Sequence, residues 1–273
     1  MHSSKTCILK FWALLVGLVI PFCIQSQETM TWCAYYNWSP WIYATAEGYE
    51  GILVEELRFF EQEHGIETKA VVIDNWKRCQ LEVANGHIDI ILGANKTPER
   101  EKILHYSSEP AFINKSTLSA YASIDNERVK MVKTLEGLKK YRLSMIRGNS
   151  FGGVVDNFVS SLDKTNLVVV NSHEQVLKLV ALKRLDYFLS PDDSYLAMLE
   201  KYREEAPKLK EAHFKQIFSM QRETPAYIAF SKKGPTFSKF HGLWIKTIRD
   251  YYASVNVAER IEFHIENSIR HKK

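Results

Sequence analysis

Short strand-like runs alternate with amphipathic helical segments along this chain, and that order constrains the fold more than any other feature. Strand-like runs at residues 30–36, 69–73 and 88–92 are separated by helical patterns at 52–64 and 76–84. Strands that are spaced by helices pair in parallel, so this order predicts an open α/β sheet.

The same order begins again in the second half of the chain, after a strand-like run at residues 116–123. Three more strand-like runs follow, each with a helical segment after it, at 142–146, 167–170 and 186–189. A last strand-like run at 226–230 precedes a long helical stripe of apolar residues. The order predicts two α/β units, with the second inserted before a C-terminal helix. Ligands of such sheets bind beyond the carboxyl ends of the strands.

The first 26 residues have the layout of a secretory signal peptide. Lys5 and Lys10 precede an apolar run at residues 11–24, which is shorter than the roughly 20 residues that cross a bilayer comfortably. We expect cleavage after Ser26 and export of the rest of the chain. An uncleaved membrane anchor is the alternative.

The charge of the exported part argues against nucleic acid as a partner. Without residues 1–26 the chain keeps 34 basic and 32 acidic residues, a net charge of +2. Nucleic-acid binders usually carry a clear basic excess, so we expect none here. This balance still permits a local basic site for an acidic ligand.

Two cysteines remain after removal of the signal peptide, Cys33 in a strand-like run and Cys79 on a helix-like face. We expect two buried free thiols. A disulfide is the alternative, since an exported compartment permits one. No Cys–His pair has the spacing of a metal site, and no two histidines stand four residues apart on a helical face. We therefore expect no metal and no cofactor.

The segment LGANKTPEREK, residues 92–102, places an arginine in the first turn of a short helical pattern. Thr97 suits the N-cap and Pro98 the first helical position. Arg100 then lies at the positive end of the helix dipole, where a cation costs a few tenths to about 1 kcal/mol. A bound anion in front of Arg100 would explain why an arginine stands in the first turn of the helix. The alternative is a surface ion pair with a neighbouring carboxylate: Glu99, Glu101 or Glu109.

Longer motifs extend through nearly all of the exported chain. They read, in order, WCAYYNWSPW, YEGILVEELRFFEQEHG, GANKTPERE, YSSEPAF, TLEGLKKYRLSMIRGNS, RLDYFLSPDDSYLAML and AYIAFSKKG. Their order and spacing resemble those of the type 2 periplasmic solute-binding proteins of family 3, the polar amino-acid binders of ABC uptake systems.

The resemblance implies an α/β, two-lobed architecture. Each lobe would hold a mainly parallel sheet flanked by helices, and two hinge strands would join the lobes. Lobe 1 would comprise residues 27–121 and 226–273, and lobe 2 residues 122–225. The ligand would lie between the lobes, which close on it by a hinge motion. The resemblance also implies a periplasmic monomer and an ABC permease in the inner membrane as its partner.

Site residues follow from the resemblance where the motifs match. Arg100 stands where the family binds the α-carboxylate of the ligand. Gly93 and Asn95 stand where a glycine and a Ser or Thr contact the charged head of the ligand. Asn149 and Ser150 match the turn that donates to the carboxylate from a helix N-terminus, with a plain helix cap as the alternative.

The rest of the implied pocket includes aromatic walls, and the sequence departs from the family at Asn95, Tyr35 and Pro191. Trp38 and Trp76 match its two walls, with core packing as the alternative. Tyr35 replaces an acidic residue of several members, which favours an aromatic or neutral ligand side chain. The aspartate that holds the ligand ammonium is replaced by Pro191. Asp192, one residue later, could take that role or cap the next helix.

The resulting hypothesis is an exported binding protein for a small carboxylate, serving uptake or sensing, without enzymatic activity. An enzyme on the same scaffold, such as a cyclohexadienyl dehydratase-like lyase, is the alternative. It would need a general acid near the substrate, and the candidates are Glu50, Glu109 and Asp192. A sensing module of a larger receptor is a third interpretation.

Overall fold

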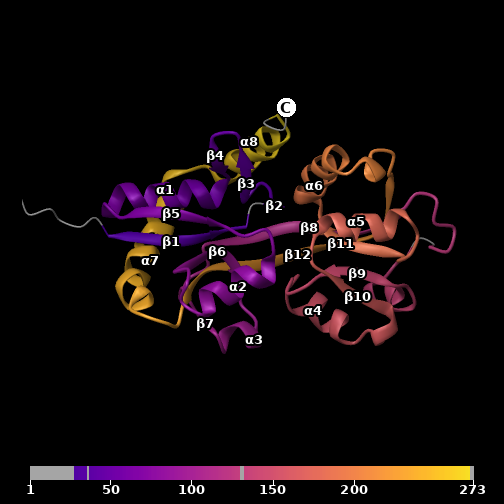
Figure 1. The fold of residues 1–273 in the computed structure, drawn as a ribbon, viewed down its shortest axis with the longest axis horizontal. Coiled ribbons are helices and arrows are strands. Elements are labelled where there is room, and N and C mark those ends of the chain that lie inside the picture. Colours follow the sequence, from indigo (N-terminus) through magenta and orange to yellow (C-terminus); the bar gives the residue numbers. More distant parts are fainter. Residues whose placement is uncertain (1–27, 36, 130–131, 271–273) are drawn as a thin grey trace, which may run out of the picture.

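Most strands of the molecule form one long curled sheet with helices on both faces (Figure 1). This computed structural model describes residues 28–35, 37–129 and 132–270, so the predicted signal peptide lies outside it. The strands of the main path follow one another across the sheet in this order: β10 (Leu167–Val170), β9 (Leu143–Ile146), β11 (Tyr187–Pro191), β8 (Phe112–Ser123), β12 (Phe214–Ser231), β6 (Ile90–Asn95), β1 (Thr29–Ala34) and β5 (Glu67–Val72). Within the described ranges, no helix combines the length and the apolar character that a membrane crossing requires.

Lobe 1 is built on β6, β1 and β5, which run parallel, with β12 antiparallel at the side of β6. Successive residues of a strand point to opposite faces. Trp32 therefore packs with α1 (Ile52–His64) and α7 (Thr236–Ser254), whereas Cys33 packs with α2 (Trp76–Ala84) on the other face. The lobe also contains shorter or peripheral elements: β2 (Asn37–Trp38), β3 (Ile42–Thr45), β4 (Gly48–Glu50), α3 (Pro98–Glu101), β7 (Leu104–Tyr106) and α8 (Val257–Arg270).

Lobe 2 repeats this plan with β10, β9 and β11 in parallel and β8 antiparallel to β11. Tyr187 and Leu189 face the core under α4 (Gly153–Ser160). Phe188 faces the opposite core, under α5 (His173–Ala181) and α6 (Asp192–Glu205). Three 3-10 turns connect these elements, at Leu135–Lys140, Lys164–Asn166 and Pro207–Leu209. Each lobe thus has two apolar cores, one on each face of its sheet.

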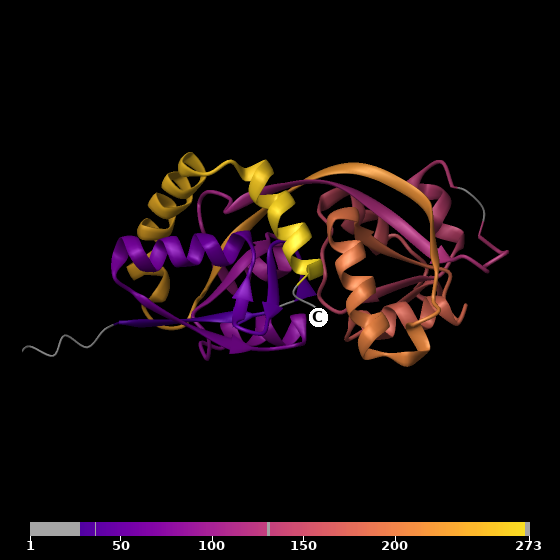
Figure 2. The same cartoon turned by 90° about the horizontal axis from the view of Figure 1, so that it is seen from above.

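Two long strands join the lobes (Figure 2). β8 and β12 pair antiparallel along their length, from Phe112 opposite Ala226 to Phe214 opposite Ser123. Because β12 also pairs with β6 and β8 also pairs with β11, the ribbon belongs to both sheets. The predicted lobe boundaries, after residues 121 and 225, fall inside these two strands. Their position stays a prediction, and Leu118 of β8 already packs in the lobe 2 core.

The strand order and the main helices agree with the predicted α/β pattern. The helices at 52–64 and 76–84 have the predicted bounds. The small antiparallel sheet β2–β3–β4 is not predicted by the sequence pattern, because its strands have only two to four residues. The sequence also predicts only residues 226–230 of β12. Its first part consists mostly of half-buried and exposed residues and is held by pairing with β8.

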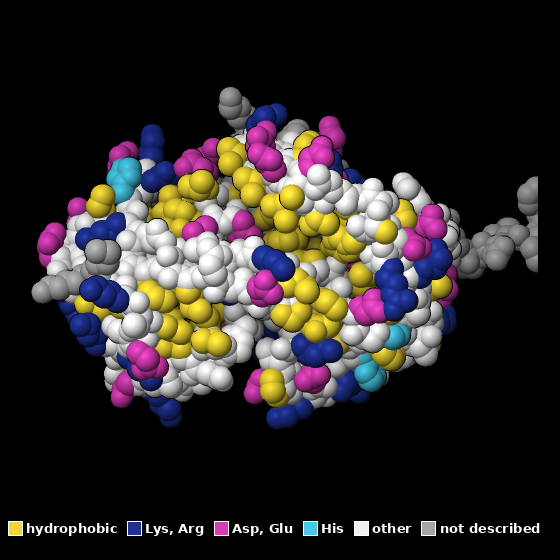
Figure 3. Space-filling model, turned by 180° about the vertical axis from the view of Figure 1, so that it is seen from behind, with side chains coloured by type: hydrophobic (Ala, Val, Ile, Leu, Met, Phe, Trp, Pro, Cys, Tyr) yellow, Lys and Arg dark blue, Asp and Glu magenta, His cyan; other side chains and the backbone are white. Residues whose placement is uncertain are grey.

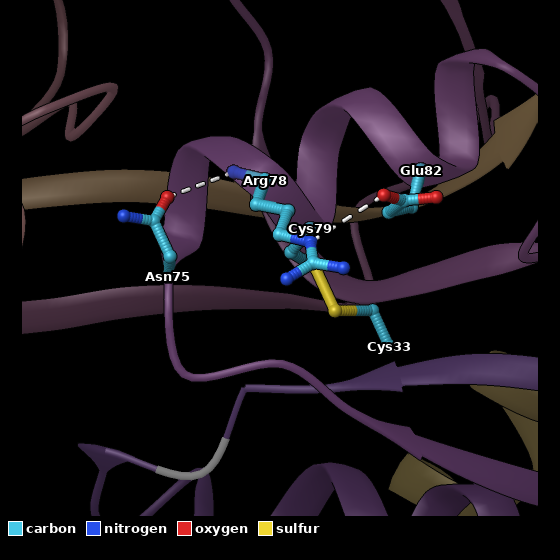
Figure 4. Close-up of a disulfide and its surroundings, with 5 residues drawn as sticks. All are labelled: Cys33, Asn75, Arg78, Cys79 and Glu82. Carbon is cyan, nitrogen blue, oxygen red and sulfur yellow. Dashed lines mark hydrogen bonds and ion pairs between the residues drawn. A yellow bond between two sulfur atoms is a disulfide. The ribbon is translucent and has the colours of Figure 1, made fainter.

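The expectation of two free thiols is wrong, since Cys33 of β1 and Cys79 of α2 form a disulfide (Figure 4). Their Cα atoms lie 6.0 Å apart, within the usual range for a bridge. α2 packs directly on the face of β1 that carries Cys33, and Cys79 lies on the inward side of the helix. Both residues are buried, as expected, but the packing brings them together.

Glu56 is a buried carboxylate between α1 and α7. It is completely inaccessible to solvent. Tyr252 Oη donates to its Oε2 at 3.2 Å, and no described residue hydrogen-bonds its Oε1. Burial raises the pKa of Glu56 to about 8, so the side chain is protonated in the folded protein at neutral pH.

This raised pKa predicts a loss of stability with rising pH. The unfolded chain releases the proton near the ordinary pKa, about 4.5, while the folded protein holds it to about pH 8. The free energy of unfolding should therefore fall between these values, and Glu56→Gln should remove that part of the fall. The gain from Glu56→Gln should grow by roughly 2–3 kcal/mol between pH 5 and pH 7, measured by urea denaturation. Glu63→Gln, on the exposed side of the same helix, is the control, and an equal gain there would contradict this assignment.

Candidate ligand-binding site

A cavity lies between the two lobes, at the carboxyl ends of the parallel strands of both. Tyr35 follows β1, Asn95 ends β6 and Trp76 begins α2 after β5; from lobe 2, Ile146 ends β9 and Pro191 ends β11. Ligands of open α/β sheets bind at this position. The cavity volume is about 140 Å³. A cavity of ~150 Å³ holds one benzene molecule, so the site suits a small ligand.

Eight of the predicted site residues line this cavity: Tyr35, Trp38, Trp76, Gly93, Asn95, Arg100, Asn149 and Ser150. Asp192 does not line it. As the first residue of α6, Asp192 accepts a hydrogen bond from Tyr121 Oη at 2.8 Å. Pro191, immediately before it, lines the cavity instead. The turn does not shift to bring the carboxylate of Asp192 into the site.

Aromatic rings form the lobe 1 wall. The rings of Tyr35 and Trp76 lie 5.4 Å apart, centroid to centroid. Trp38 lies 5.8 Å from Phe112, on the other side of Gly93. A Cβ at Gly93 would come within 2.9 Å of the Trp38 ring, and the backbone φ of Gly93 is +71°. Glycine at this position therefore lets Trp38 pack directly against β6.

Arg100 lines the cavity with 6% of its surface exposed. Thr97 caps α3 by accepting a hydrogen bond from Arg100 N at 3.3 Å. The guanidinium donates from Nη1 to the Asn95 carbonyl and from Nη2 to the Gly148 carbonyl, both at 2.7 Å. Burial lowers the pKa of Arg100, and no carboxylate of the described chain lies within 4 Å of it. The surface ion pair considered above is absent here, and Glu109 pairs with Arg249 instead.

The carbonyl of Gly148, in the loop after β9 of lobe 2, holds the lobes together. It accepts hydrogen bonds from three lobe 1 side chains: Trp76 Nε1 at 3.1 Å, Gln80 Nε2 at 3.1 Å and Arg100 Nη2 at 2.7 Å. The φ of Gly148 is +79°, and a Cβ there would lie 3.3 Å from Gln80 Nε2. Glycine thus permits both the turn and the close approach of α2.

Two further hydrogen bonds join the lobes beside the cavity. Asn95 Nδ2 donates to the Ser150 carbonyl at 2.9 Å. Ser194 Oγ of α6 donates to the Ser39 carbonyl at 2.7 Å. Seen from behind, the lobes are in contact over most of their boundary and leave a notch at the lower edge (Figure 3). The structure therefore represents a closed arrangement of the two lobes.

Several cavity residues are not predicted by the sequence pattern, and Arg222 is the most important of them. It lies in the part of β12 that the pattern does not predict as a strand. Its Nη1 donates to the Phe151 carbonyl at 3.0 Å. Burial lowers the pKa of Arg222, while Asp193 and Asp156 raise it from a distance. The only sequence signal is a basic residue in the stretch QRETP, which precedes the predicted strand at 226–230.

His173, the first residue of α5, also lines the cavity and is absent from the predicted set. Burial, together with the nearby charge of Lys201, lowers the pKa of His173 to about 4. The ring is therefore neutral at pH 7 and adds no positive charge. Asn114 and Thr224, on the two crossing strands, complete the polar lining close to Arg222.

The carboxylates proposed for an enzyme lie away from the cavity. Glu50 accepts hydrogen bonds from Asn267 and Tyr43 at the α8 side of lobe 1. Glu109 pairs with Arg249 on the surface, and Asp192 binds Tyr121. No Asp or Glu is among the described residues that line the cavity. The described part of the chain also contains no group of three or more His, Cys, Asp or Glu side chains placed to bind a metal.

Comparisons with known proteins rest on structure. No protein-family model matches this chain, and no curated protein matches it in sequence. An ancestral arginine-binding protein bound to arginine superposes with a TM-score of 0.65 at 16% identity, covering 88% of this chain and 97% of that protein. A histidine kinase sensor domain with similarity to periplasmic binding proteins superposes with a TM-score of 0.66 at 13% identity, covering 88% and 96%.

The chain has a periplasmic-binding-protein fold. A further structure with this fold is an ancestral amino acid-binding protein, a precursor of cyclohexadienyl dehydratase, with a TM-score of 0.60 at 15% identity, covering 88% of this chain and 94% of that protein. Identities this low show the fold alone. Within this periplasmic-binding-protein fold, the ligand site must therefore be argued from the residues that line the cavity.

Proposed function

We propose that this chain is an exported solute-binding protein that closes on a small carboxylate-bearing ligand. One observation carries the proposal: a buried guanidinium, that of Arg100, lines a cavity between the lobes without a carboxylate partner in the described chain. A buried cation is stable when it is paired, and a ligand carboxylate would supply the pair. Asn149 and Ser150, across the cavity, are the partners that we propose from lobe 2.

Two features restrict the ligand. The cavity is close in size to one that holds benzene, so the ligand is small. Similar structures include arginine- and glutamine-bound forms of an ancestral arginine-binding protein. A cationic side chain such as that of arginine does not suit a cavity lined by two arginines of its own, Arg100 and Arg222. We therefore propose that the ligand is an amino acid or related compound whose side chain is neutral or acidic.

Transport or sensing is the role that we propose, rather than catalysis. The carboxylates that a dehydratase-like mechanism would use lie outside the cavity, at Glu50, Glu109 and Asp192. A periplasmic location agrees with the disulfide, because such bonds persist in oxidising compartments. An ABC permease as partner, and a monomeric state, complete the proposal.

A thermal-shift screen of the purified protein tests this proposal. The panel contains the amino acids, their decarboxylated amines, small mono- and dicarboxylates, and prephenate. A carboxylate at 100 times its dissociation constant should stabilise the folded state by ~2.7 kcal/mol, whereas the decarboxylated amines should have no effect. Stabilisation by amines alone, or by no carboxylate in the panel, would contradict the proposal. Conversion of prephenate into a new product would support the enzyme alternative instead.

A further inference from the structure

Arg222 gives the cavity a second cationic group, and this restricts the ligand further. We infer that the ligand carries two anionic groups and no ammonium group, with one anion bound at Arg100 and the other at Arg222. Short dicarboxylates are the chemical class that fits. This inference rests on the proposed function, because it concerns the same cavity.

The contacts of Arg222 leave its charge available. Its Nη1 donates to the Phe151 carbonyl at 3.0 Å and lies 3.5 Å from Thr224 Oγ1. Its Nε is inaccessible to solvent and has no hydrogen-bond partner in the described chain. No described carboxylate lies within 4 Å of its guanidinium. A ligand anion in the cavity would pair with this guanidinium, whose charge no described carboxylate contacts.

The two carboxylates that raise the pKa of Arg222 are hydrogen-bonded to other groups. Asp156 accepts hydrogen bonds from Ser150 Oγ and from Phe151 N. Asp193 accepts from Ser194 Oγ at 3.2 Å, and burial raises the pKa of this carboxyl. Neither residue lines the cavity. Both carboxylates favour the charged form of Arg222 without lining the cavity.

The two guanidinium groups are arranged around one loop. Arg100 donates to the carbonyl of Gly148, and Arg222 donates to the carbonyl of Phe151, three residues later. Three residues span at most about 10–11 Å, so the two attachment points are close together. Both side chains line the same cavity of about 140 Å³. A single small ligand can therefore contact both.

The remaining lining disfavours an ammonium group and suits a short hydrocarbon body. An α-amino acid needs an anionic or strongly accepting partner for its ammonium, and no described lining residue is acidic. Two cations in the same cavity would repel such a group. The lining also includes apolar side chains, with Trp38, Phe188 and Leu189 among them. These surfaces match the methylene groups of a short dicarboxylate.

Calorimetric titration of the purified protein tests this inference with five probes: succinate, glutarate, aspartate, glutamate and butyrate. Succinate or glutarate should bind roughly ten-fold or more tightly than its amino derivative and than butyrate. Arg222→Gln should weaken binding of that dicarboxylate by about ten-fold or more and change butyrate binding by less than about two-fold. Arg147→Gln is the matched control, because Arg147 is exposed in the neighbouring loop and lies outside the cavity.

Each outcome separates this inference from the proposed function. Tighter binding of aspartate or glutamate, or of butyrate, would overturn the dianion inference and leave the carboxylate-binding function standing. Equal losses for the dicarboxylate and for butyrate in Arg222→Gln would show that Arg222 acts on the fold, and would also overturn it. The absence of binding by all five probes would overturn the dianion inference, and the thermal-shift panel then decides the broader proposal. If Arg222→Gln does not fold, the comparison of glutarate with butyrate in the unmodified protein still decides the inference.

Discussion

Replacing Arg100 with alanine is expected to lower ligand affinity by about 30-fold to several-thousand-fold. Loss of one partner from a buried, hydrogen-bonded charge pair costs roughly 2–5 kcal/mol. Arg100 is the most deeply buried cation that lines the cavity, and its side chain is held in place by two carbonyls. The loss should appear as a higher dissociation constant in a calorimetric titration and as a faster dissociation rate in a stopped-flow experiment.

The fold should survive this substitution, which makes the test specific. The Gly148 carbonyl would keep Trp76 and Gln80 as donors, and the sheet does not depend on the guanidinium. Arg249→Ala, which removes an exposed arginine of α7 paired with Glu109, is the control and should leave affinity unchanged. Arg100→Lys should retain part of the binding, since it keeps the charge and loses the planar fork. Unchanged affinity in Arg100→Ala would refute the assignment of the carboxylate site.

Removing the disulfide is expected to lower the free energy of unfolding by about 4 kcal/mol. The bridge closes a loop with a sequence separation of 46 residues, and loop-closure entropy for this length gives that value. For a chain of this size, the melting temperature should fall by roughly 8–16 °C. Urea denaturation of the double variant Cys33→Ala, Cys79→Ala measures the effect directly.

The same bridge supports the aromatic wall of the cavity, so its removal should also weaken ligand binding. Cys33 lies two residues before Tyr35, and Cys79 lies three residues after Trp76. Reduction of the unmodified protein with dithiothreitol provides the control, since it breaks the bond without creating a cavity at either cysteine. A stability loss below about 1 kcal/mol in both the reduced protein and the double variant would contradict a stabilising role.

The local sequence pattern was sufficient to predict helices whose ends are marked by capping residues. The helix at Ile52–His64 has a strong apolar stripe and ends at Gly65, whose φ is +64°. The helix at Trp76–Ala84 begins at Asn75, whose side chain accepts from Arg78 N. Such caps act within a few residues, and therefore the sequence alone can show them.

The candidate site residues came from the family resemblance, and several of them stand at the ends of strands. Tyr35, Trp76 and Asn95 lie at or just beyond the carboxyl ends of strands or at the start of the following helix, and an open α/β sheet brings these ends to one edge. Asp192 shows the limit of this argument. Its place in the chain is one residue beyond the cavity-lining Pro191, but its side chain turns toward Tyr121 on β8.

The sequence by itself determined the α/β class and the order of the strands and helices, because periodicity and caps depend on neighbouring residues. The candidate lobe 1 lining came from the family resemblance of its motifs. Only the tertiary structure decided which distant groups meet. Cys33 pairs with Cys79 because α2 packs on one face of β1. Arg222 reaches Phe151, 71 residues away, because β12 crosses from one lobe to the other. The charge of the cavity therefore depends on a crossing strand that pairing with β8, rather than local apolar pattern, holds in place.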